Sequence, residues 1–413
     1  MTDDAKLPPY ILRDLTTFSV PPEVAAARDR GELPRTKIAM PGMADPFPGG
    51  VTEAWLVTRH DDVRTVLADH RRFSNDRKHL RPNPGAPAQC PHGAPERKAN
   101  LQRMDPPEHT EYRQMLMAAF TGHRMRQWAT YVRDVVADCL SVVRAKGPGV
   151  DLIEHFALPI PSLVMCELLG VPYADHIEFQ QRARQQTDVT LSLDQRAEVR
   201  WASHAYLGSL VERAREQPGA DLLGTLVSEH GDRLDNAELV SIGELVLLAG
   251  HQSTAGMLGL SVLMLLLHPD QVRWLRMNPD RIESAVEELL RYLTVISAGP
   301  ARVAIEDVDI QGTRIRAGEL VLLSELAANR DPAFVTDPDT LDLSRPPSPH
   351  VAFGHGAHLC LGAALARLLL RTALTGLLEA FPTLELAIPV EQLRYHEDFI
   401  VFGLKELPVT WRE

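Results

Sequence analysis

The chain of 413 residues is 45% hydrophobic and 24% charged, a composition that is typical of a globular protein and excludes a largely disordered chain. Its formal net charge of -12 argues against a nucleic-acid partner, because nucleic-acid binders normally present a basic face. Four cysteines in so long a chain predict a reducing compartment and not a disulfide framework.

Residues 1–20 are acidic and then proline-containing, and they lack the apolar stretch and the small-residue cleavage site of a signal peptide. We therefore expect a cytoplasmic protein. The most apolar helical run, at 258–267, is much shorter than the ~20 residues that cross a bilayer, so we expect no membrane partner.

Residues 52–60 have the pattern of a strand and lead into a short amphipathic helix. The stretch 74–108 is rich in proline and glycine and predicts a long irregular loop, which in a compact domain is usually functional or disordered. Helical patterns dominate from there on. The run 236–267 follows Asp235, a predicted N-cap whose capping-box partner is Glu238, and it predicts a helix ~48 Å long.

Short β segments return at 303–325 and 382–411, where alternating residues and glycines suggest hairpins. Neither an internal repeat nor a linker divides the chain. We therefore expect one domain over residues 1–413, mainly α with small β-sheets.

The segment 353–362, FGHGAHLCLG, places Cys360 directly ahead of a helix rich in alanine and leucine. Gly354 and Gly356 allow a tight turn or a close approach to a flat ligand, because glycine has no Cβ. The N-terminal end of the helix is expected to lower the pKa of the Cys360 thiol and so favour the thiolate that binds metals.

Two alternatives remain open for Cys360 on its own. It is a small buried hydrophobe if it resembles most lone cysteines, or a zinc ligand together with His355 and His358. Structural zinc normally takes four Cys or His ligands, and the other cysteines are scattered singly. A single cysteine ligand in a glycine-framed loop is instead suited to haem. The other three cysteines are Cys90, Cys139 and Cys166.

This loop resembles the haem-binding loop of soluble bacterial cytochromes P450 at every defining position. The resemblance implies the single, mainly α domain of that family and a haem b whose iron is bound by Cys360. It also implies that Phe353, Gly354, His358 and Gly362 contact the haem.

The segment EELLRYLT places Glu288 and Arg291 on one helical face, where they could form an ion pair. Alone, such a pair would be an ordinary surface pair worth a few tenths of a kcal/mol. It is similar, however, to the paired Glu and Arg of the P450 family, and Arg345 stands where the family places a third partner. The resemblance implies a structural role for all three.

A haem also has two propionates, which need cationic or donor groups in a buried site. His109 and Arg113 lie four residues apart on one predicted helical face and resemble the propionate-binding helix of the family. Arg302 and His358 match two further propionate contacts. Each alone would be a surface charge, and the resemblance depends on all four together.

Within the long helix, LLLAGHQSTAGML resembles the segment over the oxygen-binding face of the haem, where Ala249 and Gly250 would permit close approach. The family's usual acid is replaced by Gln252 and its usual Thr by Ser253, with Thr254 following. Gln252 cannot ionise, although it can position a water, and Ser253 keeps a hydroxyl for a proton relay. Local bonding of these hydroxyls to the helix backbone is the structural alternative.

We expect His251, which points about 100° away from Gln252, to be structural. Substrate contacts are expected from the 74–100 loop, from 185–195, and from apolar positions on three later segments. The apolar positions are Leu247, Val295, Ile296, Ala298, Phe399, Ile400 and Val401. Basic residues at the entrance to the loop would meet an acidic substrate or carrier, or form a solvated face. They are Arg71, Arg72, Arg77, Lys78 and Arg81.

The resemblance implies a monooxygenase that hydroxylates or epoxidises a small organic substrate, such as a secondary-metabolite intermediate, free or bound to a carrier. Electrons from NAD(P)H would arrive through separate partners, a ferredoxin and a ferredoxin reductase. Gln252 raises a second hypothesis, oxidative coupling or ring closure without oxygen insertion. The third is a haem-binding protein without catalytic activity.

Overall fold

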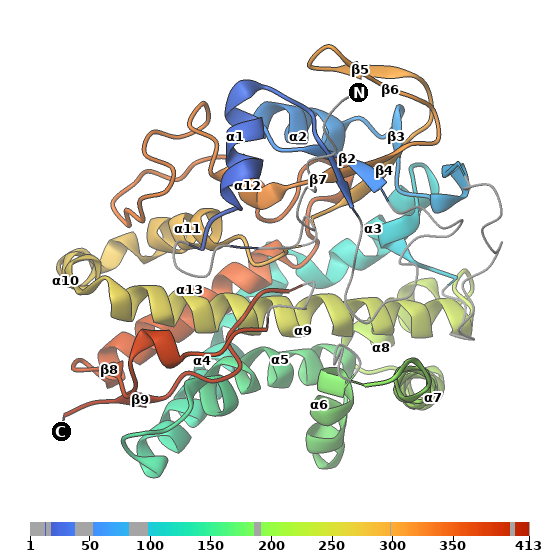
Figure 1. Cartoon of the computed structure of the whole chain (residues 1–413). Coiled ribbons are helices and arrows are strands. Elements are labelled where there is room, and N and C mark those ends of the chain that lie inside the picture. Colours follow the sequence, from blue (N-terminus) through green and yellow to red (C-terminus); the bar gives the residue numbers. More distant parts are fainter. Residues whose placement is uncertain are drawn as a thin grey trace.

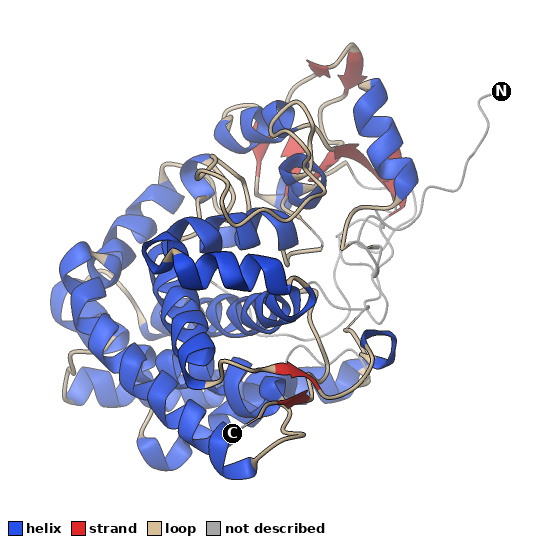
Figure 2. Ribbon diagram, turned by 90° about the vertical axis from the view of Figure 1, so that its left-hand side faces the viewer, coloured by secondary structure: helices blue, strands red, loops and turns tan. Residues whose placement is uncertain are grey.

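A computed structural model gives the fold, with helices throughout and strands collected mainly at one end (Figures 1 and 2). The structure describes residue 13 and residues 18–37, 53–81, 98–185, 191–297, 299–396 and 401–412. The architecture is therefore mainly α in a single domain with small sheets, as the sequence predicted.

Helix α9 (Asn236–Leu267) runs through the middle of the molecule and organises the other helices around it (Figure 1). It begins with the predicted capping box, in which the Glu238 N–H donates to Asp235 Oδ1 at 2.8 Å and the Asp235 N–H donates to Glu238 Oε2 at 2.7 Å. Its neighbours include α5 (Pro159–Leu169), α7 (Leu193–Glu216) and α13 (Ala363–Ala380), which bury most of its apolar surface.

The sequence prediction underestimated how apolar this helix is. Among the described residues, α9 is the one helix that is long and apolar enough to cross a membrane, with a mean hydropathy of 1.3 over its most apolar window. The same window is 56% buried inside the protein, as in the core helix of a globular domain. The prediction counted only the run 258–267, because the polar residues at 251–254 interrupt the apolar pattern.

The remaining helices form the bulk of the molecule around α9, with α1, α2 and α12 beside the sheet (Figure 1). They are α1 (Pro22–Arg30), α2 (His60–Ala68), α3 (Glu108–Met117), α4 (Gly122–Lys146), α6 (His176–Gln185), α8 (Leu222–His230), α10 (Pro269–Met277), α11 (Ile282–Leu293) and α12 (Glu325–Asn329).

The main sheet joins strands from the N-terminal part of the chain to strands from residues 301–323 and has the order β1-β2-β7-β4-β3. Strand β2 pairs parallel with β7, and β7 pairs antiparallel with β4, which brings Arg302 of β4 opposite Val321. The strands are β1 (Arg35–Lys37), β2 (Glu53–Val57), β3 (Phe73–Ser74), β4 (Ala301–Ala304) and β7 (Leu320–Leu323). The sheet therefore fixes Arg302 relative to the N-terminal part of the chain.

In the described part of the chain, two antiparallel strand pairs lie outside this sheet, and the first is a hairpin in a region where the sequence predicted one. Strands β5 (Val308–Ile310) and β6 (Thr313–Ile315) are joined by Gln311 and Gly312, both with positive φ, the conformation that a two-residue hairpin turn favours. Strands β8 (Glu385–Leu386) and β9 (Val409–Thr410) pair antiparallel across a connection that runs from residue 387 to 408, so the hairpin predicted at 382–411 is instead a pair of strands distant in the chain.

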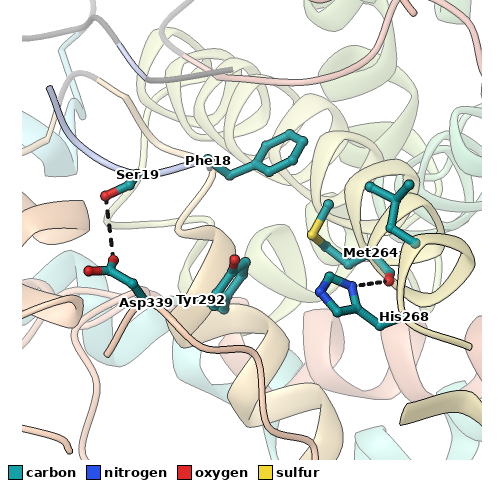
Figure 3. A pocket seen from close by; sticks show the side chains of 7 residues that line it. Phe18, Ser19, Met264, His268, Tyr292 and Asp339 are labelled. Atoms are coloured by element: carbon teal, nitrogen blue, oxygen red, sulfur yellow. Dashed lines mark hydrogen bonds between the residues drawn. The ribbon is translucent and has the colours of Figure 1, made fainter. Parts of the chain in front are cut away.

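A cavity of about 380 Å³ lies beside the C-terminal end of α9 (Figure 3). Its lining residues are Phe18, Ser19, Met264, Leu267, His268, Tyr292 and Asp339. His268 closes one side, where its Nδ1 lies 2.8 Å from the Met264 carbonyl oxygen. None of the predicted site residues lines this cavity, which lies about 16 Å along α9 from Ser253.

Candidate functional site

The loop 353–362 folds back on itself ahead of α13. The Cys360 N–H donates to the Phe353 carbonyl oxygen at 2.9 Å. Gly354 and Gly356 both have φ near +70°, a conformation that other residues rarely adopt. A Cβ on Gly356 would come within 2.7 Å of the Leu67 carbonyl oxygen, so this glycine also lets the loop pack against the end of α2.

Cys360 stands three residues before the first residue of α13, close to the predicted position. The expected lowering of its pKa was wrong in direction. Although the residue is exposed, protein surrounds the sulfur closely enough for desolvation to raise the pKa of the Cys360 thiol. The Gly362 N–H and the guanidinium of Arg113 act in the opposite direction but do not overcome burial.

The other cysteines show how Cys360 differs from a buried, unreactive thiol. Cys139 and Cys166 are buried, and burial raises the pKa of each thiol to about 12, so both are unreactive. Cys90 lies outside the described residues. Over the part of the chain that the structure describes, no three His, Cys, Asp or Glu side chains could hold a metal ion together. Cys360 is thus an exposed single thiol, as a haem site requires.

The four predicted propionate-binding residues come together from three elements. His109 and Arg113 lie on α3, Arg302 on β4 and His358 in the cysteine loop. The rings of His109 and His358 are 4.0 Å apart between centroids. Burial, followed by the charges of His109 and Arg302, lowers the pKa of His358 to about 3. At neutral pH the cations of the cluster are therefore the guanidinium groups of Arg113 and Arg302, whereas the imidazole of His358 is neutral.

Two observations test whether carboxylates fit this cluster. Arg302 is 4% exposed, its Nη1 donates among the described residues to the Ala301 carbonyl oxygen at 3.0 Å, and burial lowers the pKa of its guanidinium to about 10. His109 is 2% exposed, and among the described residues its Nδ1 has no hydrogen-bond partner. Buried cationic and donor groups of this kind need an anion, so the cluster fits the two carboxylates of a haem.

Three residues of this region had no motif that could identify them in the sequence. Asn75 Nδ2 lies 2.9 Å from His358 Nε2, and Asp105 accepts a hydrogen bond from the Asn75 N–H at 2.9 Å and another from the Ser74 hydroxyl. These contacts orient the His358 ring. The third residue, Glu325, is buried at the start of α12, and burial raises the pKa of its carboxyl to about 8.

Glu288, Arg291 and Arg345 form a buried ion-pair network. Arg291 donates two hydrogen bonds to Glu288, at 2.7 and 2.8 Å, and Arg345 Nε lies 3.3 Å from Glu288 Oε1. Arg291 is fully buried and also donates to the carbonyl oxygens of Asn329 and Pro338, each at 2.9 Å. The pair is therefore a core element and not the exposed pair that its spacing alone would suggest.

A second network, which the sequence did not indicate, holds the start of the cysteine loop. Glu287 accepts hydrogen bonds from Arg367 at 2.6 and 2.7 Å and lies 3.2 Å from His350 Nε2. The Arg367 guanidinium lies 4.6 Å from the centre of the Phe353 ring. Because the Phe353 carbonyl oxygen binds the Cys360 N–H, this network fixes the position of the cysteine.

On the opposite side, Ala249 is exposed in the middle of α9, between the half-buried residues Leu248 and Gly250. The Ser253 hydroxyl donates to the Ala249 carbonyl oxygen at 2.7 Å, and Thr254 is buried. His251 is 2% exposed, in keeping with the structural role expected for it. Close packing of α9 on α5 also explains Gly250, because a Cβ there would lie 2.5 Å from Met165 Sδ of α5.

The predicted substrate residues divide into three groups. Ile296 pairs with Val401 across an antiparallel bridge, and the Phe402 N–H donates to the Val295 carbonyl oxygen at 2.8 Å. Leu247 instead lies among Phe179, Arg182, Ser203 and Tyr206, between α9 and the helices α6 and α7. Ala298, Phe399 and Ile400 are outside the described residues, as are much of the 74–100 loop and residues 186–190.

The basic entrance residues are partly neutralised by nearby acids. Arg72 Nε lies 2.5 Å from Asp69 and Lys78 Nζ lies 2.7 Å from Asp76. Arg71 and Arg81 are exposed. This arrangement favours a solvated charged face over a concentrated site for an acidic group.

Comparison with known proteins decides the family. The profile described as Cytochrome P450 matches residues 192–408. The chain belongs to the cytochrome P450 family. Nocardicin C N-oxygenase of Nocardia uniformis subsp. tsuyamanensis is 42% identical over 387 residues, which cover 92% of this chain and 94% of that protein.

Two solved P450 structures match nearly the whole chain. The P450 StaH from biosynthesis of the glycopeptide antibiotic A47934 is 42% identical with a TM-score of 0.85, covering 98% of this chain and 100% of that one. OxyB from teicoplanin biosynthesis, in complex with the X-domain, is 40% identical with a TM-score of 0.84 and the same coverage. The protein is therefore a cytochrome P450 monooxygenase, an oxidoreductase of the haem-thiolate class.

Proposed function

We propose that this P450 inserts one oxygen atom of dioxygen into a small organic substrate, by hydroxylation or epoxidation, within a secondary-metabolite pathway. The observation that carries the proposal is the convergence of His109, Arg113, Arg302 and His358 beside the exposed thiol of Cys360. The names of nocardicin C N-oxygenase and of the glycopeptide P450 StaH support a substrate from secondary metabolism.

In this proposal Cys360 binds the iron of haem b, and the guanidinium groups of Arg113 and Arg302 and the imidazole N–H groups of His109 and His358 bind its carboxylates. The bound haem supplies dioxygen activation, which a thiolate ligand favours by donating electron density to the iron. Phe353, Gly354 and Gly362 line the cysteine side, and Ala249 gives the surface of α9 that faces the cofactor. The exposure of Ala249 in the middle of α9 supports this assignment.

The substrate would lie against α9 and the paired segments at 295–296 and 401–402. Gly256 supports this placement, since a Cβ there would lie 2.9 Å from the Phe402 carbonyl oxygen and 3.3 Å from a Val401 methyl carbon. The apolar side chains of Val295, Ile296 and Val401 would provide a lining, as ligand pockets usually have. Ala298, Phe399 and Ile400 complete the proposed set.

The electrons would come from NAD(P)H through a ferredoxin and a ferredoxin reductase, which remain separate proteins in this proposal. The substrate is an organic molecule that is either free or attached to a carrier protein. The second form is motivated by the structure of OxyB with the X-domain. Binding of the same substrate with and without its carrier would separate the two forms, because only a carrier-dependent enzyme discriminates between them.

A second candidate is oxidative coupling or ring closure without oxygen insertion. The specific observation is at residues 252 and 253, where Gln252 cannot ionise and the Ser253 hydroxyl is bound to the Ala249 carbonyl oxygen. Both features weaken proton delivery, which matters less when two substrate radicals combine.

Turnover under isotopically labelled dioxygen separates the two functions. Label in the organic product supports oxygen insertion, whereas a cross-linked product without label supports coupling. The reduced carbon monoxide spectrum tests the haem-thiolate assignment itself. A protein that lacks the red-shifted thiolate band would contradict both candidates.

The substitution Gln252→Glu tests the proton-delivery argument. A carboxylic acid at this position should raise the fraction of electrons that reach product, by up to about tenfold, less than the ~10²- to 10⁴-fold of a complete general acid because Ser253 remains. The measurement is product formed and peroxide released per NAD(P)H consumed. Gln127→Glu, at an exposed residue of α4, is the control. An unchanged ratio would remove Gln252 from the mechanism.

A further inference from the structure

Glu325 has an unusual position for a carboxyl group. It is the first residue of α12, which directly follows strand β7, and it is only 4% exposed. In the part of the chain that the structure describes, no hydrogen bond involves its carboxyl, and Glu325 has no ion-pair partner within bonding distance. An ionised carboxylate in such a site would be costly, so the surroundings favour the neutral acid.

The carboxyl lies between the cysteine loop and the propionate cluster. A Cβ built on Gly354 would be 3.8 Å from Glu325 Oε1 and 3.6 Å from the His358 carbonyl oxygen. The charge of Arg302 acts on Glu325, and the charge of Glu325 acts on Cys360. Glu325 therefore shares one region with Arg302, the most buried cation of the cluster.

The helices that pack on α12 direct their charged groups elsewhere. Arg28 of α1 donates to the carbonyl oxygens of Ala327 and Arg330, and Arg291 of α11 donates to that of Asn329. His60 of α2 contacts the Pro349 carbonyl oxygen. Arg302 and the thiol of Cys360 are thus the titratable groups that act on Glu325 from the described residues.

We propose that Glu325 is a fifth side chain of the haem-carboxylate site, where it is a neutral acid that donates its O–H to a haem carboxylate also bound by Arg302. This inference rests on the haem assignment made above. A neutral acid is a strong donor to a carboxylate and adds no charge, whereas an ionised Glu325 would repel the carboxylate and compete for Arg302. Glu325 is then a positioning residue for the cofactor, which controls how tightly the haem is held.

The test is the rate at which the haem-loaded protein releases its haem to an excess of apomyoglobin. Glu325→Gln keeps a donor that cannot ionise, and Glu325→Leu removes the donor. At about pH 7 the Gln variant should release haem at the rate of the unmodified protein, and the Leu variant about tenfold faster, the loss expected for one hydrogen bond to a charged group. Glu244→Gln, a buried carboxyl paired with His204 at 3.0 Å, is the matched control.

The dependence on pH gives a readout that a purely structural role would not produce. Burial raises the pKa of the Glu325 carboxyl to about 8, and a neighbouring haem carboxylate raises it further, so ionisation in the loaded protein should occur above about pH 8. As the pH rises through that range, release from the unmodified protein should accelerate, and the midpoint potential of the iron should fall. Neither change should occur in the Gln variant, in which the group cannot ionise. This comparison remains valid if the Leu variant does not fold.

Three results would overturn the proposal. They are slow release from the Leu variant at neutral pH, fast release from the Gln variant, and an unchanged pH dependence in the Gln variant. Failure of the haem assignment is distinct from these, because it appears in the unmodified protein as a missing thiolate band. A protein that binds haem normally but ignores Glu325 contradicts only this inference.

Discussion

On the cysteine side of the site, which comprises the loop 353–362 with α11 and α13, protein bonds fix nearly every charged group. Arg291 makes hydrogen bonds to Glu288 and to two carbonyl oxygens, and Glu287 binds both Arg367 and His350. On the α9 side, which comprises residues 247–256 and 401–403, the described contacts include apolar packing of Gly256 against Val401, the bond of the Ser253 hydroxyl to the Ala249 carbonyl oxygen and the backbone bond from Phe402 to Val295.

This difference indicates that the two sides have different roles, one in holding the metal ligand and the other in binding substrate. A metal ligand must stay at one position, and buried networks provide this because breaking any one bond leaves a buried charge. A surface that binds varied substrates depends instead on its shape, and apolar substitutions change that shape at a smaller cost in stability. Substitutions on the cysteine side should therefore affect folding and cofactor binding, and those on the α9 side should affect substrate and product.

The largest effect is expected from Cys360→Ser on the cysteine side. Serine cannot supply the thiolate, so the reduced carbon monoxide complex should lose its red-shifted band completely. Absorption spectroscopy measures this directly. Cys166→Ala, at a buried thiol, should keep the band. A full band in the serine variant would show that another residue binds the iron.

Arg291→Ala should come next, because it leaves the Glu288 carboxylate buried without its main partner. The expected loss is about 3–5 kcal/mol in the free energy of unfolding. The matched control is Arg371→Ala, whose exposed pair with Glu283 should contribute less than about 1 kcal/mol. Denaturant unfolding of both variants tests the contrast. Equal losses would mean that the buried network is not what stabilises the cysteine side.

Because of Glu287, the free energy of unfolding is predicted to fall in acid. Burial acts to raise the pKa of its carboxyl, but hydrogen bonds from Arg367 and His350 prevail and lower it to about 2. A lowered pKa stabilises the fold above the unfolded value of about 4.5 and loses that effect as the pH falls toward about 2. Glu287→Gln should remove about 2–3 kcal/mol of this acid-dependent stability.

The measurement for Glu287 is the free energy of unfolding at several pH values between about 2 and 6. Glu385→Gln, at an exposed carboxylate 3.7 Å from Arg412, should leave the profile unchanged. If the Glu287 variant follows the same acid profile as the unmodified protein, other carboxylates must account for acid unfolding.

The smallest effect is expected on the α9 side, from Gly256→Ala. The added Cβ would lie 2.9 Å from the Phe402 carbonyl oxygen, so the segment 401–403 must shift, at a cost of about 1 kcal/mol after the gain in helix propensity. Gly208→Ala on α7, where a Cβ meets nothing within 4 Å, should instead stabilise by about 0.5–1 kcal/mol. The Gly256 variant should also bind substrates differently, which ligand-induced spectral shifts measure. Equal effects of the two changes would contradict close packing at Gly256.

Local signals in the sequence predicted much of the fold. The capping residues Asp235 and Glu238 located the start of α9, and the loop glycines located the turn before Cys360. Pairing of β2 with β7 could not be predicted, because it joins strands more than 260 residues apart without a local signal. The mainly α architecture could thus be predicted from the sequence, whereas the strand order of the sheet could not.

For the site, sequence motifs predicted the cofactor-binding residues but not the residues that pack around them. The four propionate-binding residues His109, Arg113, Arg302 and His358 were predicted to share one ligand, and the structure brings them together. The direction of the Cys360 pKa was wrong because the sequence shows the nearby helix end but not the burial that opposes it. Asn75 and Glu325 were missed because a lone polar residue acquires its role only from partners distant in the chain.

The first turn of α9 has a consequence for motion. Each of its two capping carboxylates uses one oxygen for the cap and the other for a distant partner: Asp235 binds Lys98 at 2.8 Å, and Glu238 accepts from the Tyr112 hydroxyl of α3. Fraying of this turn therefore breaks a hydrogen bond that ties α3, which holds His109 and Arg113, to α9. Amide hydrogen exchange at 238 and 239, whose N–H groups donate to Asp235, should report this fraying.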